Sequence, residues 1–131
     1  MRKIYLADPI FQCDDHECLT WRDQIKENLL GYYFLDPMER DYRGVTDQFV
    51  SDIVEGDKND IDLSDILLVN HVKPSVGTSM EILYAWERNK EVYIISSNNE
   101  NSPWLIYHST KIFQFFYEAI DFLSLPQIAT A

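Results

Sequence analysis

Five short apolar runs, separated by segments with helical signals, constrain the fold of this chain more than any other feature. The runs are rich in β-prone residues and occupy positions 3–7, 32–37, 65–70, 91–96 and 111–115. Strands that alternate with helices pair in parallel through right-handed crossover connections. The sequence therefore predicts an α/β fold, a three-layer sandwich whose central five-stranded sheet is mostly parallel. Small ligands bind such sheets beyond the carboxyl ends of the strands.

Helices are expected between these strands. The first is predicted to start at the capping residue Thr20 and to end before Gly31. The second is predicted from Thr46 through residue 64, with Gly56 as a candidate interruption. Further helices are predicted from Thr78, over 102–109 and over 117–123. The inner face of the second helix is expected to hold Phe49 and Ile53, with Val50 and Val54 as further candidates.

Length, charge and hydropathy limit the classes of protein to consider. The chain has 131 residues, 46% of them hydrophobic, which is enough for a single domain over residues 1–131. Its formal net charge of −11 argues against a nucleic-acid polymer as partner. No apolar run approaches the roughly 20 residues needed to span a bilayer, and Asp8 comes too early for a signal-peptide core. A water-soluble, cytoplasmic protein is expected.

Two acidic segments raise the question of a metal. The stretch CDDHEC places His16 between Cys13 and Cys18, but no second cluster of Cys and His follows, so two reduced loop cysteines are expected in place of a zinc site. In the segment 55–65, a calcium loop counted from Asp57 would have Asp62 where glycine is required. No metal site is predicted.

The segment 55–65 has two other interpretations. Its acidic residues can form a solvated face. Alternatively, Asp57 and Asp60 lie near the ligand-binding edge, where crowding can raise the pKa of one carboxyl group and keep a proton available.

The stretch HVKPSVGTSMEILYAWE, residues 71–87, also has two interpretations. Pro74, Ser75 and Gly77 can form a turn that places backbone amides and hydroxyl groups at the positive end of a helix, as in an anion site. The spacing of Thr78 and Glu81 equally matches a capping box, in which the two side chains satisfy the first helical amides.

Several of these segments, taken together, resemble the nucleoside 2-deoxyribosyltransferase superfamily. They are KIYLADPIF at the start, Asp57 eight residues before the Asp65 that opens DILLV, then PSVGTSMEILYA and SPW. The resemblance covers residues 3 to about 123 and is closest in motif to the 2'-deoxynucleoside 5'-monophosphate N-glycosidase branch. It implies a small Rossmann-like or flavodoxin-like sandwich, in agreement with the strand and helix pattern.

The resemblance also implies catalytic roles. Glu81 takes the place of the family's nucleophile, which attacks C1' of the deoxyribose and forms a covalent glycosyl ester. Asp57 takes the place of the residue that protonates or hydrogen-bonds the leaving base, and Tyr5 that of the tyrosine that orients the glutamate. This chemistry needs no cofactor. A glutamate in the first helical turn could be either a cap or the nucleophile.

The same resemblance assigns substrate contacts. Family members that act on free nucleosides usually carry a carboxylate where Ser75 stands and an amide where Ser102 stands; hydroxyl groups there suit a 5'-phosphate. In the similar hydrolases the second serine comes from a neighbouring subunit, which implies a homodimer or larger homo-oligomer. The other expected contacts are Gly77 and Thr78 at the helix and Asp8, Pro9 and Ile10 in the loop after the first strand.

One departure from the family pattern leaves the substrate open. Asp8 stands where the family usually has glycine, and a carboxylate there could repel a phosphate or bind a sugar hydroxyl. The alternatives to a nucleotide N-glycosidase are therefore a transferase that exchanges bases between deoxynucleosides and a nucleotide-binding module without turnover. Arg22, Arg43 and His108 are candidate specificity residues, although an exposed helix face or loop accounts for each more readily.

Overall fold

The computed structural model describes residues 1–10, 13–97 and 102–126 and contains one five-stranded parallel sheet. The strand order is β2-β1-β3-β4-β5, and every described pairing is parallel, where a mostly parallel sheet was expected. The three-layer α/β fold is confirmed. The strands are β1 (Lys3–Ala7), β2 (Tyr33–Leu35), β3 (Ile66–Asn70), β4 (Glu91–Ile95) and β5 (Lys111–Phe113).

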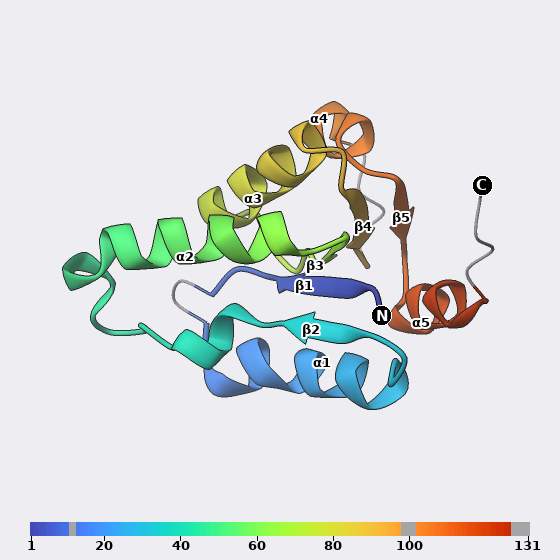
Figure 1. Cartoon of the computed structure of the whole chain (residues 1–131), viewed down its shortest axis with the longest axis horizontal. Coiled ribbons are helices and arrows are strands. Elements are labelled where there is room, and N and C mark those ends of the chain that lie inside the picture. Colours follow the sequence, from blue (N-terminus) through green and yellow to red (C-terminus); the bar gives the residue numbers. More distant parts are fainter. Residues whose placement is uncertain (11–12, 98–101, 127–131) are drawn as a thin grey trace.

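Helices cover both faces of the sheet (Figure 1). Helices α1 (Asp15–Asn28) and α5 (Phe116–Ser124) pack on one face, and α2 (Val50–Leu63), α3 (Val76–Glu87) and α4 (Pro103–Tyr107) lie on the other. Two short 3-10 helices, η1 (Pro37–Arg40) and η2 (Thr46–Gln48), connect β2 to α2. Within the described ranges, no helix is both long and apolar enough to cross a membrane.

The buried strand β1 sends alternate side chains to the two layers, as the two-residue period of a strand requires. Ile4 and Leu6 pack with the side chains of α1 and α5, whereas Tyr5 and Ala7 pack with those of α2 and α3. All four are at most 1% exposed. The alternation therefore aims Tyr5 at the layer that contains α2 and α3.

Helix α1 begins earlier than the sequence pattern indicated. Thr20 was expected as the cap, but the helix starts at Asp15, and Asp14 and Glu17 form a capping box around its first turn. The acidic stretch is thus the start of a helix and not a loop. Cys18 lies within α1, and both cysteines are free and buried.

Helix α2 differs from expectation in three ways. It begins at Val50 and not at Thr46, it continues through Gly56 without a break, and its buried residues are Asp60 and Ile61. The expected inner face was wrong: Phe49 precedes the helix and is 36% exposed, Ile53 is only partly buried, and the further candidates Val50 and Val54 are 61% and 44% exposed. The first half of α2 projects past the end of β1 (Figure 1), so no sheet lies beneath its apolar side chains.

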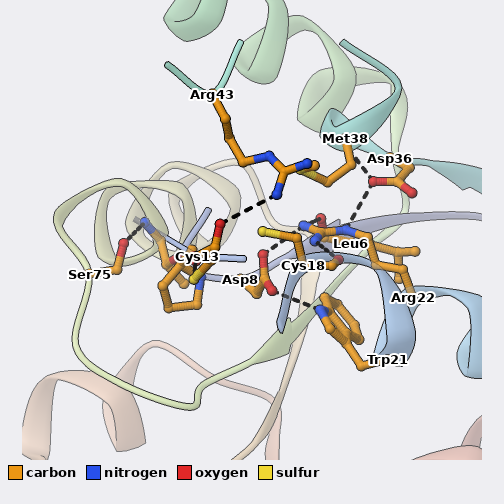
Figure 2. A network of polar contacts seen from close by, with 12 residues as sticks. Leu6, Asp8, Cys13, Cys18, Trp21, Arg22, Asp36, Met38, Arg43 and Ser75 are labelled. Atoms are coloured by element: carbon orange, nitrogen blue, oxygen red, sulfur yellow. Dashed lines mark hydrogen bonds and ion pairs between the residues drawn. The ribbon is translucent and has the colours of Figure 1, made fainter. Parts of the chain in front are cut away.

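A buried ion-pair network joins the ends of β1 and β2 to α1 (Figure 2). The Arg22 side chain, expected to be exposed, is fully buried and lies 2.9 Å from both Asp8 Oδ1 and Asp36 Oδ1. It also donates to the carbonyl groups of Leu6 and Cys18. Both 2.9 Å contacts are ion pairs between opposite charges that are almost fully buried.

Two neighbours complete the network around these carboxylates. Trp21 Nε1 donates to Asp8 Oδ2 at 2.8 Å, and Lys26 Nζ donates to Asp36 Oδ2 at 2.8 Å. The charges of the two buried carboxylates are therefore balanced by the buried Arg22 guanidinium together with the partly exposed Lys26 ammonium group.

We predict that Arg22→Met destabilises the protein by roughly 3–5 kcal/mol, because it leaves Asp8 and Asp36 buried with much less compensating charge. Urea denaturation followed by circular dichroism measures the change. Arg88→Met is the control: its side chain is 42% exposed and pairs with Asp62 at the surface, so a loss of about 1 kcal/mol or less is expected. Equal losses for the two variants would contradict the assignment.

Candidate active site

A pocket of about 700 Å³ opens at the carboxyl ends of β1 and β3, where the parallel sheet was expected to bind a ligand. Its volume lies within the range typical of small-molecule sites. Four segments form its walls: the loop after β1, the connection that contains η1 and η2, the first half of α2 and the start of α3. The exposed apolar side chains of α2 belong to this wall, which includes Val50, Ile53 and Val54.

The three predicted catalytic residues meet beside this pocket. Tyr5 projects from β1 into the layer of α2 and α3, Asp57 comes from α2 and Glu81 from α3. The two carboxylates line the pocket. The Tyr5 hydroxyl and Glu81 Oε2 are buried, and neither has a hydrogen-bond partner of good geometry among the described residues. Each nevertheless lies close enough to shift the pKa of the other. Such unsatisfied buried groups call for an explanation, and a ligand is one.

Burial and crowding shift all three pKa values upward. Burial raises the pKa of Glu81 to about 8, and the negative charge of Asp57 adds to the shift, whereas Tyr5 and Arg22 oppose it. Burial raises the pKa of Asp57 as well, with Arg40 opposing it. Burial and then the Glu81 charge raise the pKa of Tyr5. Glu81 therefore holds a proton near neutral pH, and such shifts are common for functional carboxyl groups.

Glu81 is not the helix cap. Helix α3 begins at Val76 and is capped by Ser75, whose Oγ accepts a hydrogen bond from the Thr78 amide at 3.4 Å. Thr78 is thus a residue of the first turn, and Glu81, the sixth residue of the helix, lies in the second turn. The capping-box interpretation of Thr78 and Glu81 was wrong, because the helix starts one turn earlier than that pattern required.

The start of α3 supplies polar groups to the pocket. Ser75, Gly77 and Thr78 all line it, as expected. Thr78 is 1% exposed, and its Oγ1 has no hydrogen-bond partner in the described part of the chain. The first amides of a helix have no partner within the helix. This end of the pocket can therefore donate hydrogen bonds to an anion or a hydroxyl group.

The loop after β1 forms the adjacent wall. Asp8 and Ile10 line the pocket, whereas Pro9 does not and instead accepts a hydrogen bond from the Cys13 thiol through its carbonyl oxygen. Burial raises the pKa of Asp8, and the charge of Arg22 opposes that rise. Because Arg22 and Trp21 contact the Asp8 carboxylate, its charge is largely satisfied within the protein.

Ser102 is separate from this pocket within the chain. It precedes α4 as the predicted cap position, with Pro103 next, but its side chain makes no capping hydrogen bond to the helix. His108 ends α4 and packs against the rings of Trp104 and Tyr107. Neither residue lines the pocket.

Arg43 does belong to the pocket. It lines the cavity and pairs with Asp15 and Asp41, each at 2.7 Å, so the expectation of a plain exposed loop was wrong. Figure 2 shows its guanidinium reaching toward the Cys13 carbonyl. As for metals, the described residues contain no group of three or more His, Cys, Asp or Glu that could hold an ion.

The sequence did not identify Arg40 as a site residue. Arg40 ends η1, lines the pocket and donates to Asp57 at 3.2 Å and to Asp60 at 2.8 Å. Its neighbours Met38, Tyr42 and Asp47 also line the pocket. Arg40 ends a 3-10 helix of four residues, which is too short to show a periodic pattern that would indicate the direction of its side chains.

Comparison with known proteins supports the fold. No protein-family model and no curated protein sequence matches this chain. A 2-deoxyribosyltransferase from Bacillus psychrosaccharolyticus superposes with a TM-score of 0.75 at 20% identity, over 91% of this chain and 90% of that one. A 2-desoxiribosyltransferase from Leishmania mexicana gives 0.69 at 19% identity, over 93% and 96%. A CMP N-glycosidase from Clostridium botulinum gives 0.62 at 18% identity, over 93% and 97%. The chain thus has the fold of these enzymes.

Proposed function

We propose that this chain is an enzyme that cleaves the N-glycosidic bond of 2'-deoxynucleoside 5'-monophosphates through a covalent intermediate on Glu81. One observation carries the proposal: Glu81 lies at the pocket beside Tyr5 and Asp57, and its Oε2 atom is buried with no hydrogen-bond partner of good geometry among the described residues. The shared fold with two deoxyribosyltransferases and a CMP N-glycosidase supports this class of reaction.

The chemistry uses two carboxylates and proceeds in two steps. First, a Glu81 oxygen bonds to C1' of the sugar while the bond from C1' to the base nitrogen breaks, and the electron pair leaves with the base. Asp57 lies on the base side, where it hydrogen-bonds or protonates the leaving group. Water then adds its hydroxyl group to C1', the ester bond breaks and Glu81 is released. The other proton of that water returns to the carboxyl groups.

The start of α3 is the proposed site of the 5'-phosphate. Ser75, Gly77 and the amides of the first turn present donors and the positive end of a 12-residue helix. Asp8 does not oppose this, because its carboxylate is paired with Arg22 inside the protein. A phosphate therefore meets donors at Ser75 and little uncompensated negative charge at Asp8.

The main rival is a base transferase, which the two deoxyribosyltransferase neighbours favour. It differs in its unphosphorylated substrate and in the second step, where an acceptor base replaces water. Incubation with deoxynucleotides and deoxynucleosides, with and without a free base, separates the candidates by their products. A nucleotide-binding module would bind these compounds without releasing base.

A second subunit is part of the proposal. Ser102 does not line the pocket of its own chain, which favours a role at the pocket of a neighbouring copy. Next to Ser102 on α4, two large side chains offer exposed apolar surface for such a contact: Trp104 is 73% and Tyr107 is 70% exposed. A homodimer or larger homo-oligomer is expected.

We predict that Glu81→Gln lowers turnover of deoxynucleotides by at least about a thousandfold, because the amide cannot form the ester. The fold is expected to persist, since Glu81 caps no helix. Base release followed by chromatography measures the rate. Glu87→Gln, an exposed change at the end of the same helix, is the control and is expected to leave the rate unaltered. Near-normal turnover by Glu81→Gln would refute the mechanism.

We also predict a pH dependence. Since the pKa of Glu81 is raised to about 8, the nucleophilic carboxylate is scarce at low pH, and kcat/KM should rise about tenfold per pH unit up to that value. The negative charge of Asp57 contributes to the shift, so Asp57→Asn should move the inflection to lower pH. A profile of kcat/KM between pH 5 and 9 tests both statements. A flat profile for the wild type would contradict them.

The choice of substrate is tested at position 75. Ser75→Asp places a carboxylate beside the proposed phosphate, an interaction of about 4 kcal/mol per pair of charges at roughly 4 Å and an effective dielectric near 20. Cleavage of deoxynucleotides should collapse, while cleavage of deoxynucleosides persists or rises. Ser75→Asn is the matched neutral control, and Asp and Asn both cap helices well. If the wild type prefers nucleosides and Ser75→Asp changes little, the transferase becomes the better hypothesis.

A further inference from the structure

The guanidinium group of Arg40 packs against helix α2 at Gly56. A methyl group added at Gly56 would stand 3.3 Å from both Nε and Nη2 of Arg40, closer than side chains ordinarily approach. Glycine inside a helix costs about 1 kcal/mol relative to alanine. Gly56 thus leaves room for the guanidinium group against the helix.

The guanidinium group of Arg40 has more N–H donors at the pocket than its two hydrogen bonds use. Arg40 donates from Nη1 to Asp60 and from Nη2 to Asp57, which uses two of its five N–H groups. Within the described ranges no other acceptor is bonded to it, and its side chain remains 35% exposed where it lines the pocket. A cation with unused donors is therefore available to a bound molecule.

The position of this cation bears on the fate of the leaving base. Under the proposed function, Asp57 faces the base, so a guanidinium 3.2 Å from Asp57 lies at the same end of the substrate. Burial raises the pKa of Asp57 and the charge of Arg40 opposes that rise, so a positive charge stands beside the carboxyl group that faces the base. The base departs with an electron pair, and some group must stabilise that charge.

We propose that Arg40 stabilises the negative charge that develops on the leaving base, beside Asp57. The inference rests on the proposed function and adds a residue to it. As the bond from C1' to the base nitrogen breaks, its electron pair spreads over the ring nitrogen and the carbonyl oxygens of the base, and the Arg40 donors meet those atoms. A fixed cation aimed at developing charge is a strong source of rate enhancement and transfers no proton.

A leaving-group series tests this role. The substrates are deoxyuridine 5'-monophosphates with fluorine, hydrogen or methyl at C5 of the base, since fluorine makes the base a better leaving group and methyl a slightly poorer one. Removing one such electrostatic contact costs about a hundredfold to a thousandfold in rate. Arg40→Met should therefore slow the methyl substrate about a hundredfold and the fluoro substrate distinctly less. If Arg40 has only a structural role, Arg40→Met would slow all three substrates by the same factor.

Two further variants keep the test sound if Arg40→Met folds poorly. Gly56→Ala retains Arg40 and favours the helix, but its methyl group displaces the guanidinium, so the same unequal slowing is expected on a smaller scale. Arg40→Ala should regain activity in millimolar guanidinium and not in urea, which is neutral and of similar shape. Arg88→Met, an exposed arginine outside the pocket, is the control.

The outcomes separate the inference from the function on which it rests. If the wild type releases base and Arg40→Met slows every substrate equally or not at all, Arg40 does not stabilise the leaving base and the proposed function stands. If the wild type releases no base from this series or from any of the common deoxynucleotides and deoxynucleosides, the proposed function and the role of Arg40 both fall.

Discussion

The buried contact between Arg22 and two aspartates is the interaction on which the site depends. Asp8 follows β1, Asp36 follows β2 and Arg22 comes from α1, so one guanidinium holds three elements at the carboxyl edge of the sheet. Replacing a buried ionic cluster with apolar groups is often favourable for stability, so stability alone does not account for it. Its effect here is positional, because it sets the direction of the two loops that enclose the pocket.

The carboxyl groups at this pocket differ in whether a positive group lies beside them. Asp8 and Asp57 each have an arginine as partner, whereas Glu81 has none and is kept neutral by burial. In a chain with a net charge of −11, positive groups are few, and Arg22, Arg40 and Arg43 all lie at or beside this pocket. The arrangement leaves one carboxyl group chemically distinct, and a two-carboxylate reaction needs such a difference.

Much of this organisation could be predicted from local patterns. The apolar runs identified all five strands, and the resemblance of several segments to a known family pointed to the three residues that meet at the pocket. The failures have physical causes. The capping pattern at Thr78 and Glu81 competed with the real cap at Ser75, and the apolar side chains in the first half of α2 face a cavity and not a core. The burial of Arg22 and the pairing of Arg40 depend on residues 14 to 20 positions away in sequence, which no local spacing reports.

The projection of α2 beyond the sheet has a consequence for hydrogen exchange. Its last turn is anchored by Asp60 and Ile61, which are 8% and 1% exposed, whereas Val50 at its start is 61% exposed. Local opening is easiest where few apolar contacts are buried, so the amides at the start of α2 should exchange with solvent well before those at its end. A ligand that covers Val50 and Val54 adds the missing contacts to that wall alone. Ligand binding in the pocket would thus be detected as slower amide hydrogen exchange at the start of α2.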